Sequence, residues 1–222
     1  MILLQPALNQ VLHYLGAGEN APDQLRRQVE EVSRQLSETL QPRWVWRVFP
    51  ILRQGNGFFL SQTRITLTGR VASLMLEDCT QAAMLCCTLG SEFDTMLRAA
   101  QARDMAHAAI LDACGSALVE AGCDKVMEEM AQKLKGQHLT DRFSPGYGDL
   151  PLTLQPTICS GLETRRKLGV YTSASLLLNP AKSVTAFVGI SDRPQPARVR
   201  GCAYCNMQET CTMRKGGKTC GL

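Results

Sequence analysis

Four cysteines lie close together near the end of the chain and could do chemistry. Cys202, Cys205, Cys211 and Cys220 follow the spacing C-x2-C-x5-C-x8-C. A set of this kind can form disulfides, hold a structural metal ion, or hold an electron-carrying cluster. The N-terminal stretch lacks the basic region and cleavage site of a signal peptide, so we expect a cytoplasmic protein with reduced thiols. Disulfides are therefore disfavoured, and the tail is interpreted as a set of metal ligands.

Most of the basic excess of the chain surrounds these cysteines. The net charge is +4, and one acid, Glu209, stands in the tail against five cations: Arg198, Arg200, Arg214, Lys215 and Lys218. Cations near four thiolates stabilise the negative charge of a metal centre, although a solvated basic tail explains the same pattern. The remainder shows neither the basic stripe with interleaved aromatics of a nucleic-acid binder nor an apolar run of about 18 residues that could span a membrane. We expect neither nucleic acid nor membrane as a partner.

A second candidate for chemistry is the loop Asp141–Thr157, DRFSPGYGDLPLTLQPT. Three prolines and two glycines predict an ordered loop, which can direct backbone groups at a ligand. Arg142 can pair with a carboxylate in a bidentate manner, and Tyr147 can stack and donate a hydrogen bond. A proline-rich crossing on the surface would have the same composition.

The loop also resembles a known motif. Arg142-Phe143-Ser144-Pro145-Gly146-Tyr147 is similar to the R-x-x-P-G-Y motif of the S-adenosylmethionine-binding activation domain of cobalamin-dependent methionine synthase. Residues 168–175, LGVYTSAS, and residues 179–185, NPAKSVT, are similar to a later block of that domain. The resemblance covers about fifty residues, from Arg142 to Ser191. It implies an α+β (mixed α/β) fold with helices packed on an antiparallel or mixed sheet.

The resemblance further implies reductive reactivation of a corrinoid (vitamin B12) protein within methionine biosynthesis. S-adenosylmethionine would donate the methyl group that re-forms methylcobalamin from inactive Co(II), a methyltransferase-type activity. By analogy, Arg142 would bind the methionine carboxylate, and Ser144, Pro145 and Gly146 would complete the cofactor-binding loop. Tyr147 would line the catalytic, methyl-delivering side. A non-catalytic module that binds S-adenosylmethionine, with a structural zinc tail, is the alternative.

The sequence departs from the family after Tyr147 and at its C-terminal end. Gly148-Asp149-Leu150 stands where the family carries acidic and histidine residues, and the cysteine tail replaces an aromatic segment. No corrinoid-binding module is present, so cobalamin should sit on a partner protein in trans, with a ferredoxin or flavodoxin as electron donor. The tail would then hold an iron–sulfur cluster, of the 4Fe–4S type, or zinc, and free thiols are the remaining alternative. We expect residues 1–195 to form the binding domain and residues 196–222 the metal-binding tail.

Hydrophobic patterns predict the elements that position these residues. An amphipathic helix that ends before Pro42 is predicted by the helical spacing of five apolar residues: Leu25, Val29, Val32, Leu36 and Leu40. Residues 44–51 and 58–69 are rich in β-branched and aromatic side chains, and the intervening QGNG predicts a hairpin. Helices are predicted for residues 71–100, with a break near Leu89-Gly90, and for residues 103–135, where small residues favour close packing.

The other cysteines and the histidines are predicted to have no chemical role. Cysteines within the predicted helices are interpreted as small buried apolar residues, and Cys159 has no partner at ligand spacing. His13, His107 and His138 stand apart from one another. No Ser-His-Asp arrangement, Walker loop or G-x-G-x-x-G is present in the sequence, so hydrolase and nucleotide-hydrolysing functions lack support.

Overall fold

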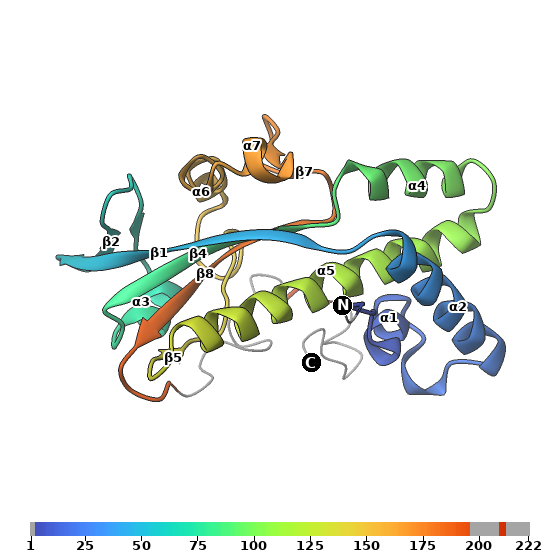
Figure 1. Ribbon diagram of the computed structural model, residues 1–222, viewed down its shortest axis with the longest axis horizontal. Helices are drawn as coiled ribbons and strands as arrows, with labels where there is room; N and C mark the ends of the chain where they lie inside the picture. Colours follow the sequence, from blue (N-terminus) through green and yellow to red (C-terminus); the bar gives the residue numbers. More distant parts are fainter. Residues whose placement is uncertain (1–2, 196–208, 212–222) are drawn as a thin grey trace. The chain divides into compact units, whose positions relative to one another are not determined.

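The computed structural model describes residues 3–195 and 209–211, and it has a mixed α+β architecture (Figure 1). In chain order the elements are α1 (Leu8–Tyr14), the 3-10 helix η1 (Gly18–Asn20), α2 (Asp23–Thr39), β1 (Arg43–Gln54), β2 (Gly57–Leu60), β3 (Thr66–Leu67), α3 (Arg70–Leu76), β4 (Gln81–Thr88), α4 (Ser91–Gln101), α5 (Met105–Lys133), β5 (His138–Leu139), the 3-10 helix η2 (Leu152–Leu154), α6 (Gln155–Leu162), α7 (Thr164–Leu168), β6 (Tyr171–Thr172), β7 (Leu178–Asn179) and β8 (Ser183–Ser191).

The main sheet has the strand order β3-β2-β1-β4-β8-β5. The pairs β1–β2, β2–β3 and β5–β8 are antiparallel. The predicted hairpin is confirmed, because Gln54 pairs with Gly57 across the two-residue turn Gly55-Asn56. Its second arm is shorter than predicted, since β2 ends at Leu60 and the chain turns before β3.

One predicted element is wrong. The sequence pattern predicts helix for residues 81–88, but they form the strand β4. All but the first residue of β4 are buried, and the strand lies between β1 and β8 in the sheet. A strand buried on both faces is an almost continuous apolar run without alternation, and its Ala, Met and Leu residues favour helix in isolation. Its cysteines Cys86 and Cys87 are buried, as predicted.

The chain divides into two compact units. The first contains the N-terminal segment to Val45 together with Cys87–Glu128 and Thr164–Val184, and the second contains Trp46–Cys86, Glu129–Glu163 and the chain from Thr185 onward. In the first unit α1 packs on α2, and α2 buries Val29, Val32 and Leu36 along one face, which confirms the predicted amphipathic helix.

Small residues of α5 allow close packing inside the first unit, as the sequence predicts. A methyl group added at Gly115 would lie 2.2 Å from the ring of Phe93, a fully buried residue of α4. A methyl group at Gly122 would lie 2.5 Å from the Pro42 side chain and 2.8 Å from the sulfur of Cys87. Glycine at these two positions therefore sets how closely α5 approaches its neighbours.

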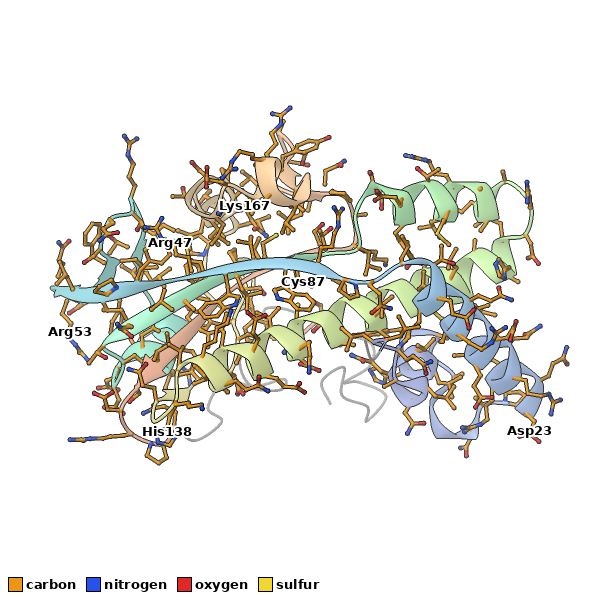
Figure 2. The ribbon with its side chains drawn as sticks, in the orientation of Figure 1. Asp23, Arg47, Arg53, Cys87, His138 and Lys167 are labelled. Atoms are coloured by element: carbon orange, nitrogen blue, oxygen red, sulfur yellow. The ribbon has the colours of Figure 1, made fainter. Side chains whose placement is uncertain are left out.

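The second unit carries the hairpin of β1 and β2, with α3 packed against β2. Figure 2 shows Arg53 near the end of this hairpin and His138 on the short strand β5, with its ring directed outward. Among the described residues, we find no helix with both the length and the apolar character needed to cross a membrane.

Candidate functional site

The Arg142–Tyr147 loop of the second unit is built on a tight turn. The Tyr147 N–H donates to the Ser144 C=O at 3.1 Å, which closes a four-residue turn with Pro145 and Gly146 at its centre. Gly146 has φ +90°, a value that side chains disfavour, and proline fixes the φ that the preceding position needs. This is the arrangement of a type II turn. The P-G pair of the motif therefore has a direct structural reason.

The loop is held at its N-terminal side by the edge of the sheet. Phe143 and Phe187 of β8 exchange both backbone hydrogen bonds, at 3.0 and 2.8 Å, and their ring centroids lie 5.7 Å apart. Just before the loop, the Thr140 N–H donates to the Gly189 C=O at 2.9 Å, and the Gly189 N–H donates to the Thr140 hydroxyl at 2.8 Å. The segment entering the loop is thus an extension of the strand β5.

The loop is held at its C-terminal side by Asp149. Its carboxylate accepts the backbone N–H groups of Arg70 and of Val71, the latter at 3.0 Å, at the start of α3. Desolvation acts to raise the pKa of the Asp149 carboxyl although the residue is exposed, but the hydrogen bonds from Val71 and Arg70 outweigh it, so the pKa lies below its ordinary value of 3.8. The carboxylate is therefore ionised at neutral pH.

The chain that follows the loop is anchored by a buried polar pair. Gln155, the first residue of α6, accepts a hydrogen bond from the hydroxyl of Thr185 on β8, and both residues are buried. Each group satisfies the other in the interior, where an unpaired polar atom would be costly. The loop is consequently connected to α3 and to the part of β8 from Thr185 onward, both within the second unit.

The predicted binding residues lie together on this loop. Pro145 is buried, Gly146 is exposed, and Arg142, Ser144 and Tyr147 are half-buried. Phe143, which lies between Arg142 and Ser144, is buried and is bridged to Phe187 of β8. The sequence motif is thus a single local structure.

The second block of the motif lies mainly in the first unit. Residues 171–179 form the hairpin of β6 and β7, which pairs Tyr171 with Asn179, and a cis peptide bond joins Asn179 to Pro180. The segment after Pro180 is held by side chains of other elements: the Ala181 N–H donates to Asp94 at 3.1 Å, and the Ser183 and Thr88 hydroxyls are 2.8 Å apart.

Lys182 provides a further anchor for this block in the first unit. Its ammonium donates to Asp112 at 2.9 Å and to the Ser116 hydroxyl at 2.8 Å, both on α5. It also lies 6.0 Å from the centre of the Phe93 ring. The lysine side chain is 15 % exposed, so this ion pair is partly removed from solvent.

The predicted metal site lies almost wholly outside the described residues. Of its four cysteines only Cys211 is described, with a half-buried thiol; Cys202, Cys205 and Cys220 lie outside. Within residues 3–195 and 209–211, no group of three or more histidines, cysteines or acids is placed to hold a metal ion. Five of the other described cysteines are buried, as predicted: Cys79, Cys86, Cys87, Cys114 and Cys123. Cys159 is buried as well. Burial raises the pKa of the Cys114 thiol, and a hydrogen bond with Ser33 opposes that effect.

Two contributors to these structures were not anticipated. In the sequence, Asp149 stands out only as a departure from the motif, and Lys182 only as one residue of the second block. One local feature indicates that α3 needs a capping group from elsewhere in the chain. Its N-cap residue is Gly69, and no side-chain hydrogen bond caps the helix from that position. Nothing in the sequence around α3 identifies Asp149, 79 residues after Arg70, as the residue that caps the helix.

A comparison with solved structures finds a similar domain. The structure of the MetH reactivation domain bound to AdoHcy matches with a TM-score of 0.61 and 18% sequence identity, over 89% of this chain and 73% of that chain. No protein-family profile matches the sequence, and no curated protein matches it. At this level of identity the similarity shows the fold, which is the α+β architecture of a MetH reactivation domain.

Proposed function

We propose that this protein binds S-adenosylmethionine at the Arg142–Tyr147 loop and reactivates a corrinoid protein in trans. The observation that supports the proposal most directly is the loop itself, a type II turn tethered at both ends by hydrogen bonds, in a fold similar to a reactivation domain bound to AdoHcy. S-adenosylhomocysteine is what remains of S-adenosylmethionine after methyl transfer. The same site would therefore hold donor and product.

The proposed reaction transfers one electron and one methyl group to the cobalt of the partner protein. A one-electron donor of the flavodoxin or ferredoxin class reduces the partner's Co(II) to Co(I). Co(I) then attacks the methyl carbon of S-adenosylmethionine, so a cobalt–carbon bond forms while the sulfur–methyl bond breaks. Methyl-Co(III) and S-adenosylhomocysteine are the products. Methyl capture removes Co(I) and so draws the unfavourable reduction forward.

Each loop residue has a proposed role in this reaction. Arg142 binds the methionine carboxylate through a charge-assisted hydrogen bond. The Gly146 N–H donates to Leu150 and the Ser144 C=O accepts from Tyr147, so we assign the ligand contacts to the Ser144 N–H and the Gly146 C=O. Pro145 holds the turn, and Tyr147 lines the side from which the methyl group leaves.

The cysteine tail supplies the proposed link to the electron donor. Residues 1–195 form the binding domain in this proposal, and residues 196–222 form a tail in which Cys202, Cys205, Cys211 and Cys220 bind a metal centre. Four thiolates suit either an iron–sulfur cluster or zinc. We propose the iron–sulfur cluster because only a redox-active centre would serve the reduction of Co(II).

Calorimetry with S-adenosylmethionine tests the binding site. The wild-type protein should bind at micromolar to sub-millimolar strength, and Arg142→Ala should weaken binding by about 1.5 to 3 kcal/mol, the usual contribution of a hydrogen bond to a charged group. Arg64→Ala removes the same charge from an exposed position of the second unit and should bind like wild type. If wild type gives no binding heat, or if Arg142→Ala binds equally well, the proposed site is wrong.

A corrinoid protein tests the reaction. With an isolated corrinoid methyltransferase in its Co(II) state, a reductant and S-adenosylmethionine, the cobalamin spectrum should convert to the methyl-Co(III) form only when this protein is present. Binding of S-adenosylmethionine without that conversion would favour a ligand-binding module without reductive chemistry.

A further inference from the structure

The carboxylate of Asp149 caps a helix that lies far from it in sequence. It accepts the first two backbone N–H groups of α3, those of Arg70 and Val71, across 79 and 78 residues. Unbonded N–H groups at a helix start normally find a side chain from the N-cap residue. Here the N-cap is Gly69, which has no such side chain, so the cap comes from the loop that carries the R-x-x-P-G-Y motif.

The fit between Gly69 and Asp149 is close. Gly69 has φ +96°, and a methyl group added there would lie 2.5 Å from one carboxylate oxygen of Asp149 and 2.8 Å from the carboxyl carbon. Glycine is therefore needed both for the backbone angle and for the approach of the carboxylate. Gly69 before α3 and Asp149 after the motif therefore depend on each other: a larger residue at position 69 would displace the carboxylate.

The hydrogen bonds of Phe143 and Asp149 fix the two ends of a short segment of the loop. Phe143 is bonded to β8, and Asp149 is bonded to α3, so only the five residues from Ser144 to Gly148 lie between two fixed points. Three of these five residues, Ser144, Gly146 and Tyr147, are ones to which we assign a role in binding S-adenosylmethionine. Without the Asp149 tether, this segment would lose its hydrogen bonds to the start of α3.

We infer that Asp149 is a positioning residue for S-adenosylmethionine, which it holds indirectly by fixing the loop on α3. This inference rests on the proposed function. A loop that is already ordered loses less conformational entropy when a ligand binds, so its affinity is higher than that of the same loop untethered. Loss of the tether should weaken S-adenosylmethionine binding about tenfold although Asp149 itself does not contact the ligand.

A matched control exists in the first unit. Asp104 accepts the backbone N–H groups of Ala106 at 2.9 Å and His107 at 3.1 Å at the start of α5, so it also forms two capping bonds. Asp104→Ala and Asp149→Ala thus remove the same kind and number of interactions. We expect both variants to melt at lower temperature, and only Asp149→Ala to bind S-adenosylmethionine more weakly in calorimetry.

Two further variants distinguish positioning from general loss of structure. Asp149→Asn keeps one of the two acceptor oxygens, so its affinity should lie between those of wild type and Asp149→Ala. Gly69→Ala changes no residue of the loop but displaces the Asp149 carboxylate, so it should weaken binding as Asp149→Ala does. If Asp149→Ala fails to fold, Gly69→Ala tests whether the tether positions the loop. If the wild type binds and either disrupting variant binds as tightly, the inference is overturned while the proposed function stands. A wild type that does not bind S-adenosylmethionine overturns both.

Discussion

Replacement of Lys182 by methionine should destabilise the first unit measurably, although only one charged group is removed. Methionine retains most of the apolar stem, so the change is confined to the ammonium and its bonds to Asp112 and Ser116. A hydrogen bond to a charged group contributes about 1.5 to 3 kcal/mol, and an exposed ion pair about 0.2 to 1 kcal/mol. Lys182 is 15 % exposed and Asp112 is 50 % exposed, so we expect an intermediate loss of about 1 to 2 kcal/mol.

Urea denaturation of four variants measures this quantity. A double-mutant cycle of Lys182→Met with Asp112→Ala isolates the interaction of the pair, for which we expect about 0.5 to 1.5 kcal/mol. Lys125 forms an ion pair of 2.7 Å with Glu128, with side chains 47 % and 59 % exposed, and serves as the control. Lys125→Met should cost at most about 0.5 kcal/mol. Equal losses for the two lysines, or a coupling free energy near zero, would refute the argument that burial strengthens the Lys182 pair.

Three further outcomes are expected. Gly115→Ala should lower the free energy of unfolding by about 1 to 3 kcal/mol because its methyl group would overlap the Phe93 ring, whereas Gly161→Ala, which meets only the flexible end of Met84, should be close to neutral in the same denaturation experiment. The capping bonds of Asp149 stabilise the protein fully above its ordinary pKa of 3.8 and are lost as pH falls through the lower folded-state pKa, so the melting-temperature difference between wild type and Asp149→Ala should shrink at acid pH; a constant difference would contradict this. Anaerobically purified protein should be brown, and Cys205→Ser should lose iron and corrinoid reactivation but keep S-adenosylmethionine binding, whereas a colourless wild type with one zinc would exclude electron relay by the tail.

The sequence was sufficient wherever neighbouring residues determine the structure. The amphipathic helix α2 follows from its apolar spacing, and the turn between β1 and β2 follows from Gly55-Asn56. The motif turn follows from Pro145 and Gly146, since one fixes φ and the other permits a positive φ. These are short-range effects of backbone sterics and side-chain periodicity, so they can be predicted from a few consecutive residues. They placed the predicted binding residues on one ordered loop.

Tertiary structure decided what depends on distant partners. Residues 81–88 form a strand because β1 and β8 lie on either side of them, which outweighs their local preference for helix. Asp149 caps α3, and Lys182 pairs with Asp112, only because the fold brings residues from different parts of the chain together. A side chain's local sequence does not specify which distant backbone group or charge it will meet. Burial and hydrogen bonding at such positions are therefore properties of the folded chain, and the structure alone supplied them.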